Sequence, residues 1–280
     1  MGEVLDCGGK VLDLSRPVVM GILNVTPDSF SDGGRYGDLG RAVVRAWEMV
    51  EEGAAIIDVG GESTRPGADP VEEEEELRRV IPVIERLVSE EIPVPLSIDT
   101  SKPAVMRAAA SAGAGMINDV RALREPGALE AAAESGLPVC LMHMQGEPRS
   151  MQQAPVYEHV VAEVTAFLRE RISVCISAGI PPERLVVDPG FGFGKTLRHN
   201  LTLLAHLDTF QVLGMPLLVG ISRKRMLGEL TGREMEDRMP AGLAAHLLAV
   251  ERGARIVRTH DVAPTLDALK VWLAVREIGD

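Results

Sequence analysis

Polar side chains follow short apolar segments of the sequence, at the point where each segment ends. They are Asn24, Asp58, Asp99, Asn118 with Asp119, His143, Asp188, Ser222, and Arg258 with His260. Carboxylates and amides can pair with the donors of a flat, nitrogen-rich ligand, while arginine and histidine can hold an anion. Buried polar groups without partners cost about 1–3 kcal/mol each, so a polar ligand that satisfies them is the simplest explanation if the segments meet. Single members of the set can instead be helix caps, as Asp99 is in part before Lys102 and Pro103.

The segments that carry these residues have the pattern of buried parallel strands. Each is short and aliphatic, and each is followed by a longer stretch with helical periodicity. Eight strand-then-helix units predict one α/β domain over residues 1–280, a single (β/α)8 TIM barrel, with an open doubly wound sheet as the alternative. The expected strands are 18–25, 55–60, 94–99, 115–119, 139–142, 185–188, 217–220 and 255–258, and the expected helices are 39–52, 71–90, 105–112, 129–134, 156–178, 201–213, 241–252 and 264–277.

The connections that follow strands are the longest ones, which predicts the position of the site. Residues 26–37, 61–69 and 145–155 are long and polar, whereas 91–93 and 213–216 are short. Active sites of this fold lie at the C-terminal ends of the strands. The polar strand ends should therefore converge there on one cavity.

The composition argues against several classes of partner. The formal net charge is −12, and nucleic acids and anionic membranes select clustered Lys and Arg instead. No apolar run approaches the roughly 20 residues that span a bilayer, and residues 1–10 lack a signal pattern. Cys7, Cys140 and Cys175 are far apart and form no Cys-x-x-Cys pair, as is typical of a reducing compartment. We expect a cytoplasmic protein that binds small molecules, not nucleic acid or membrane.

Three local patterns have simpler explanations than a binding site. The glycine-rich segment 190–196 lacks the Walker A pattern, because Pro189 stands where that pattern needs glycine. His199 and His206 lie seven residues apart, which is typical of one helix face. The acidic run 72–76 is typical of a solvated helix start, where negative charge complements the helix dipole.

Two of the long loops closely resemble the signature loops of dihydropteroate synthases. The first covers residues 21–34, Gly-Ile-Leu-Asn-Val-Thr-Pro-Asp-Ser-Phe-Ser-Asp-Gly-Gly, and the second covers 60–67, Gly-Gly-Glu-Ser-Thr-Arg-Pro-Gly. Further similar segments are 97–100, 117–120, 188–195, 222–224 and 258–261, so the similarity extends from the first strand to the last. The resemblance implies a transferase of folate biosynthesis that condenses 6-hydroxymethyl-7,8-dihydropterin pyrophosphate with p-aminobenzoate to 7,8-dihydropteroate and pyrophosphate.

The resemblance also assigns the strand ends to parts of the pterin. It implies that Asp188 accepts hydrogen bonds from the guanidine-like edge of the ring, with Asn118 and Lys224 on neighbouring atoms. Asp99 would lie near the ring nitrogen that gains positive charge, where a carboxylate stabilises the transition state more than the ground state. Met142 and Phe193 are added to this pterin pocket, and the implied catalytic residues are Asp99, Lys224, Arg258 and His260.

The leaving pyrophosphate needs local positive charge in an acidic protein. Arg258 and His260 follow the last strand, which matches the usual phosphate site of the fold. The resemblance makes Asn24 a ligand of Mg2+, and one protein ligand is enough, because this ion keeps waters and binds substrate oxygens.

Loss of pyrophosphate in an SN1-like step would leave an electrophilic methylene for the amine of p-aminobenzoate. No strong protein base is required, and the two loops would close over the site. For Asp28, simple turn chemistry is the alternative. The implied residues of the aminobenzoate pocket and lid are Thr64, Arg65, Pro66, Phe30, Ser222, Asp28 and Asp32.

One residue departs from the family pattern, and two other functions stay open. Many members have serine after the Ser-Arg-Lys triplet, where this chain has Arg225, which would either pair with the aminobenzoate carboxylate or face solvent. A pterin-dependent methyltransferase domain should lack the first loop and the Arg-Thr-His segment, and a non-catalytic paralogue should have lost residues of the lid or the anion site. The resemblance further implies a homodimer and a sulfonamide target.

Overall fold

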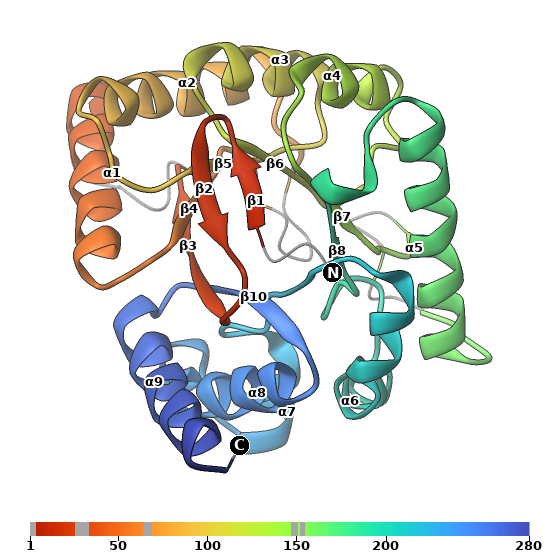
Figure 1. Cartoon of the computed structure of the whole chain (residues 1–280). Coiled ribbons are helices and arrows are strands. Elements are labelled where there is room, and N and C mark those ends of the chain that lie inside the picture. The colour runs from red at the N-terminus through yellow and green to blue at the C-terminus, as the bar shows by residue number, and fades with distance from the viewer. Residues whose placement is uncertain (1–3, 26–33, 64–68, 147–150, 152–154, 280) are drawn as a thin grey trace.

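A closed barrel of parallel strands forms the centre of the computed structural model, which describes residues 4–25, 34–63, 69–146, 151 and 155–279 (Figure 1). The strands are hydrogen-bonded in the order β10-β3-β4-β5-β6-β7-β8-β9, so each pairs with its predecessor in the chain and the last pairs with the first. Their bounds are β3 Val18–Asn24, β4 Ile56–Gly60, β5 Leu96–Asp99, β6 Met116–Asp119, β7 Val139–Met142, β8 Leu185–Asp188, β9 Leu217–Val219 and β10 Ala254–Thr259.

Helices alternate with the strands and form the outer layer (Figure 1). Their order after successive strands is that of a (β/α)8 barrel, with two helices, α7 and α8, between β9 and β10. The helices are α1 Gly34–Glu51, α2 Glu73–Ser89, α3 Pro103–Ala112, α4 Ala128–Ser135, α5 Val160–Ser177, α6 Leu197–Ala205, α7 Arg225–Thr231, α8 Met239–Glu251 and α9 Val262–Gly279, with short 3-10 turns at η2 Pro182–Arg184, η3 Leu207–Leu213 and η4 Met235–Asp237.

Side chains of the strands fill the barrel as well as the space under the helices. Successive residues point to opposite faces of a strand, so Val19 packs toward the helices while Met20 packs inside. The interior is therefore a packed core rather than a pore. Its residues from the barrel strands are Met20, Ile56, Met116, Cys140, Val186, Leu218 and Ile256.

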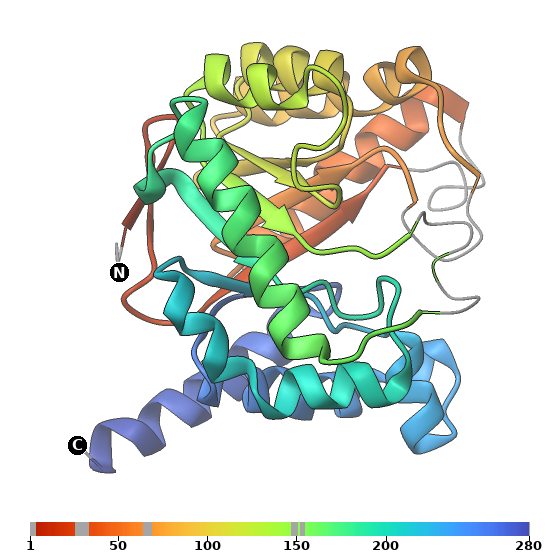
Figure 2. The ribbon, with the colours of Figure 1, turned by 90° about the vertical axis from the view of Figure 1, so that its right-hand side faces the viewer.

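A two-stranded hairpin covers the end of the barrel from which the strands start (Figure 2). It consists of β1 Val4–Cys7 and β2 Lys10–Asp13, which pair antiparallel. Leu5, Cys7 and Leu12 are buried and join the barrel's inner core. With this end covered, only the carboxyl end is left for polar strand ends to gather around a ligand.

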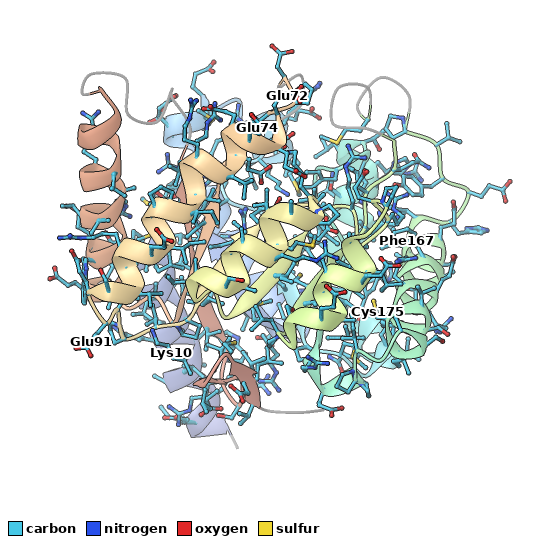
Figure 3. The ribbon with its side chains drawn as sticks, turned by 90° about the horizontal axis from the view of Figure 1, so that it is seen from above. Lys10, Glu72, Glu74, Glu91, Phe167 and Cys175 are labelled. Atoms are coloured by element: carbon cyan, nitrogen blue, oxygen red, sulfur yellow. The ribbon has the colours of Figure 1, made fainter. Side chains whose placement is uncertain are left out.

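The acidic run begins at the first turn of α2, as expected. Glu72 and Glu74 are exposed and point away from the molecule at the start of this helix, while Glu91 and Lys10 lie at its other end (Figure 3). The last residue of the run differs from the expectation of a wholly solvated helix start, because Glu76 is buried. Lys102, which precedes α3, forms ion pairs with both Glu76 and Glu62 and so compensates this buried charge.

The predicted barrel is confirmed, with eight strands at the expected positions. Three details differ. The hairpin and α7 were not expected, and the expected helix 201–213 is in fact the end of α6 followed by the 3-10 turn η3. A single domain over residues 1–280 stays a prediction.

All three cysteines are buried and unpaired, in accord with the expectation of free thiols. Burial raises the pKa of Cys7 to about 12 and that of Cys175 to about 11. Within the described residues, no helix combines the length and the apolar character that crossing a membrane requires.

Candidate active site

The strand-end residues lie around the open, carboxyl end of the barrel. Parallel pairing brings them level with one another: Gly60 is in register with Asp99, and Asp99 with Asn118. On the other side of the barrel, Met142 is in register with Asp188. Since neighbouring strands lie only about 4.8 Å apart, polar groups from successive strands can contact one another directly.

Arg258 connects strand β10 with β4 and β5 through its guanidinium. Its Nε lies 2.6 Å from Asp58 Oδ2, and its Nη2 lies 2.7 Å from Asp99 Oδ2. The side-chain amide of Asn118 donates to the same oxygen of Asp58 at 3.0 Å. Asp58 is fully buried and Asp99 is nearly so, hence water screens these charges only weakly.

Burial shifts the proton equilibria of this cluster. It raises the pKa of Asp99 to about 7, although the positive charge of Arg258 opposes the rise and Asp58 adds to it. Burial alone would lower the pKa of Arg258, but the carboxylates of Asp58 and Asp99 outweigh it and the net pKa is raised. The guanidinium therefore stays charged, while Asp99 gains and loses its proton near neutral pH.

Lys224 and Asp188 carry opposite charges that influence each other, and Lys224 lies next to an aromatic ring. The ammonium of Lys224 donates to the carbonyl oxygen of Phe191 and lies 4.5 Å from the centre of the Phe193 ring. Burial lowers the pKa of Lys224 to about 8 despite the charge of Asp188. Burial raises the pKa of Asp188, while Lys224 and the backbone N–H of Gly190, at 2.7 Å from Oδ1, oppose that rise.

The loops after β9 and β10 meet in a third group of contacts. Ser222 Oγ lies 3.0 Å from His260 Nδ1 and also accepts the backbone N–H of His260 at 3.3 Å. Next to them, Arg223 donates in a fork to Asp261, with Nη2 at 2.5 Å and Nε at 3.2 Å. The fork holds Arg223 in the left-handed backbone region, at φ 56°, which is unfavourable for a residue with a side chain.

Two of the polar strand ends are engaged in local structure. Asp119 accepts backbone N–H groups from Arg121 at 2.8 Å and Leu123 at 2.7 Å, so it caps its own loop. His143 contacts the buried Lys195 through Nδ1 at 2.9 Å. Burial lowers the pKa of His143 to about 2, so this imidazole stays neutral.

Lys195 stabilises a loop at the carboxyl end of the barrel, a role that the sequence did not predict. It is almost fully buried and donates to the carbonyl oxygens of Gly190 at 2.8 Å and Phe193 at 2.9 Å, in addition to His143. These hydrogen bonds therefore fix the loop that carries Phe193 beside Lys224. The available signal is a lysine that ends the glycine-rich segment 188–195, which resembles the family pattern but does not reveal what this lysine contacts.

Apolar residues form a small cluster beside the Lys224 pair. Met142 and Met144 are buried together with Val120 and Met151, and Phe193 packs against them. Met142 and Phe193, the two apolar residues expected in the pterin pocket, therefore lie in one apolar cluster. The lid and pocket residues Phe30, Asp28, Asp32, Thr64, Arg65 and Pro66 lie outside the described residues.

Asn24 lies at the end of β3, half-buried and close to Asp99 across Gly60. A Cβ atom on Gly60 would lie 3.6 Å from Asp99 Cβ and 3.9 Å from Asn24 Oδ1, so the missing side chain leaves space between them. One amide oxygen beside this gap, which a methyl group would fill, can serve as the single protein ligand of Mg2+, which takes most of its ligands from water and substrate. In the described part of the chain, no group of three His, Cys, Asp or Glu side chains is placed to hold a metal ion.

Arg225, the departure from the family pattern, points to solvent. Its side chain is 75% exposed and forms an ion pair with Glu229 one turn along α7, at 2.6 Å. An exposed pair of this kind contributes little stability. Of the two roles expected for Arg225, the structure therefore has the solvent-facing one.

The fold and the site together define a class of protein, a TIM-barrel enzyme for a polar ligand with an anionic group. A family model described as pterin binding enzyme matches residues 20–260. The dihydropteroate synthase of Escherichia coli (strain K12) is 57% identical, over 94% of this chain and 93% of the relative. Among solved structures, the Xanthomonas albilineans dihydropteroate synthase with 4-aminobenzoic acid has 59% identity and a TM-score of 0.93, covering 99% of each chain. The structure of that species' enzyme in complex with 7,8-dihydropteroate has 54% identity and a TM-score of 0.88, covering 98% of this chain and 99% of the other.

The chain belongs to the pterin binding enzyme family and, within it, to the dihydropteroate synthases. It is accordingly an enzyme, a transferase of the folate pathway whose reaction is dihydropteroate synthesis. Similarity over nearly the whole chain supports this activity over the methyltransferase and over the non-catalytic paralogue.

Proposed function

We propose that the residues gathered at the carboxyl end of the barrel condense 6-hydroxymethyl-7,8-dihydropterin pyrophosphate with p-aminobenzoate. The observation that carries this proposal is the arrangement of charge: two buried carboxylates share the guanidinium of Arg258, and Asp188 lies beside Lys224. Such a site offers acceptors to a nitrogen-rich ring and cations to its diphosphate.

The pterin would be held between the two charged groups. Asp188 accepts from the guanidine-like edge, while Asn118 and Lys224 contact neighbouring ring atoms. Phe193 and Met142 supply the apolar wall that excludes water. Asp99 lies on the side of Arg258, where a carboxylate stabilises positive charge that develops on the ring during the reaction.

The diphosphate would bind at Arg258 and His260. His260 is oriented by Ser222, and Arg258 stays charged at all relevant pH values. Asn24 would hold Mg2+, which would neutralise part of the negative charge on the leaving pyrophosphate.

Bond cleavage would precede attack by the amine. Departure of pyrophosphate leaves a positively charged methylene conjugated with the ring, and Asp99 favours that state. The amine of p-aminobenzoate then forms the new C–N bond and loses a proton to solvent. Ser222, with Thr64, Arg65, Pro66 and Phe30, would shape the aminobenzoate pocket, and Asp28 and Asp32 would order the lid; a sulfonamide would compete for the same place.

A homodimer and a cytoplasmic location complete the proposal. Apolar side chains are exposed on the last helix, which extends beyond the barrel toward the C-terminus (Figure 2). Val271 and Val275 are each 66% exposed, and Leu248 of the neighbouring α8 is 47% exposed. Such a surface favours contact with a second copy. Three buried, unpaired thiols support a reducing compartment.

The test is to mix the purified protein with the pterin pyrophosphate, p-aminobenzoate and Mg2+ and to follow pyrophosphate release. We expect release that requires p-aminobenzoate and is lost in Asp188→Ala. The matched control Asp208→Ala, at an exposed acidic residue of η3, should keep full activity. Release at the same rate without p-aminobenzoate, or tight pterin binding without release, would contradict the proposal.

A further inference from the structure

Asp58 contacts Asn118 and Arg258, two residues that are proposed to bind the substrate. The proposed reaction assigns no role to Asp58 itself. Its carboxylate is fully buried on β4. One oxygen, Oδ2, receives both Arg258 Nε at 2.6 Å and Asn118 Nδ2 at 3.0 Å. The other oxygen, Oδ1, has no hydrogen-bond partner among the residues that the structure describes.

This half-paired, buried carboxylate is difficult to explain by stability. Removing a carboxylate from water is costly, and good hydrogen bonds to both oxygens are needed to compensate. Asp58 forms its hydrogen bonds through one oxygen only. A buried carboxylate that lacks this compensation is expected at a site where function requires it.

The contact with Asn118 determines which end of that amide faces the ligand. A carboxylate can only accept hydrogen bonds, so the amide nitrogen of Asn118 must face Asp58. The carbonyl oxygen is then the end left for the substrate. Asp58 thereby makes Asn118 an acceptor for an N–H group of the ring.

The contact with Arg258 leaves part of the guanidinium able to change partners. Nε is bound to Asp58, whereas Nη2 is bound to Asp99. The diphosphate and Asp99 compete for the same positive group, and Asp99 is also needed at the ring. With Nε anchored, Arg258 can exchange the carboxylate of Asp99 for the diphosphate and remain in place.

We propose that Asp58 is a positioning residue for this reaction, which orients Asn118 as an acceptor and anchors Arg258 while its other nitrogens pass from Asp99 to the diphosphate. This inference rests on the proposed function and extends it to a residue that does not touch the substrate. Substitution of a residue with only a structural role would change the KM values of both substrates alike. Substitution of a positioning residue would change only the KM for the pterin pyrophosphate.

The variant Asp58→Asn removes the charge at nearly constant volume. We expect the KM for the pterin pyrophosphate to rise by about tenfold or more, since a hydrogen bond to a charged group is lost, and the KM for p-aminobenzoate to stay within about twofold. The matched control is Ser97→Ala. Ser97 is the register partner of Asp58 on β5 and is equally buried, and its Oγ has no hydrogen-bond partner within the described residues.

Ser97→Ala should leave both KM values within about twofold of the wild-type values, because no interaction with Arg258 or Asn118 is removed. Equal increases in both KM values of Asp58→Asn, or the same increase in Ser97→Ala, would show a general loosening of the barrel and overturn the proposal.

A double-mutant cycle tests the orientation of Asn118 directly. If Asp58 acts in part through this amide, Asp58→Asn should lower kcat/KM for the pterin pyrophosphate less in an Asn118→Ala background than in the wild type. The expected difference is about threefold or more. Full additivity of the two losses would refute this part of the proposal.

A crystal structure of the Asp58→Asn protein without substrate separates this inference from the proposed function. We expect the guanidinium of Arg258 to turn toward Asp99 and the amide of Asn118 to lose its fixed orientation. Unchanged positions of both groups would overturn the inference even in a fully active enzyme. Absence of turnover in the wild type would contradict the proposed function alone, because the structural result does not depend on turnover.

Discussion

At the scale of single residues, the site contains two groups whose pKa values lie close to neutral pH. Burial raises the pKa of Asp99 to about 7 and lowers that of Lys224 to about 8. The proposed reaction needs an ionised Asp99 and a protonated Lys224. Both conditions hold together only in a narrow range of pH.

The pH dependence of kcat/KM for the pterin pyrophosphate should therefore be a narrow bell. Activity falls below about pH 7 as Asp99 gains its proton and above about pH 8 as Lys224 loses its own. In Lys224→Arg the basic limb should move to much higher pH, because a guanidinium does not titrate in this range. If the residual activity of that variant keeps an unchanged basic limb, a group other than Lys224 causes the loss of activity at high pH.

The buried amino group of Lys195 should contribute to stability. Lys195→Met leaves the carbonyl oxygens of Gly190 and Phe193 without this donor, and we expect a loss of about 2 kcal/mol or more in the free energy of unfolding. Urea denaturation measures the loss. The control Lys270→Met, at a lysine that is 64% exposed, should change this free energy by less than about 0.5 kcal/mol. Equal losses of stability in the two variants would show that the buried hydrogen bonds of Lys195 do not stabilise the protein.

The sequence predicted which side chains lie at the carboxyl end of the barrel, but not which partners each of them contacts. Every candidate in the described ranges does lie at the carboxyl end of its strand or in the loop that follows. Asp119 and His143 have the same sequence signal as Asp99 and Asn118, yet they contact loop backbone and Lys195. Which partner a strand-end side chain meets depends on loops folding back over it, and no local pattern contains that information.

At the scale of elements, the β1–β2 hairpin was not predicted, because its strands are too short for their sequence pattern to indicate a strand. Each strand has only four residues, although alternation of exposed and buried positions is visible in Val4–Cys7. The barrel strands were predictable because both faces are buried and the apolar runs are continuous. Helix α7 was missed because its seven residues are too few to display a helical period.

Residue Leu12 of this hairpin tests its structural role. Leu12→Ala should lower the free energy of unfolding by about 2–4 kcal/mol, because Leu12 is 3% exposed against the barrel's inner core. The values of kcat and KM should stay near those of the wild type, since the site lies at the other end. The neighbour Val11, 67% exposed, provides the control Val11→Ala with little effect on urea unfolding. A changed KM in Leu12→Ala would mean that the two ends are coupled.

At the scale of the whole molecule, the charge distribution separates the general surface from the site. The formal net charge of −12 would repel an anionic substrate, yet Lys224, Arg258 and His260 all lie at one end of the barrel. In the proposed function, these cations hold the diphosphate locally. The proposed association of two copies would involve a different region, the outer side of α8 and α9.

The proposed homodimer predicts a specific effect of charge on α9. Val275→Glu should convert the dimer into a monomer in sedimentation or light scattering, because a carboxylate in an apolar interface is left unpaired. Val212→Glu is the matched control, since both valines are 66% exposed and Val212 lies on η3. Retention of the dimer in the α9 variant would place the interface elsewhere.

The buried cysteines have a consequence for the chemistry that the protein can undergo. Alkylating reagents and peroxides attack the thiolate form, and burial disfavours that form at Cys7, Cys140 and Cys175 alike. The chain has no other cysteine, so oxidation of its thiols requires that the barrel first unfolds, locally or completely.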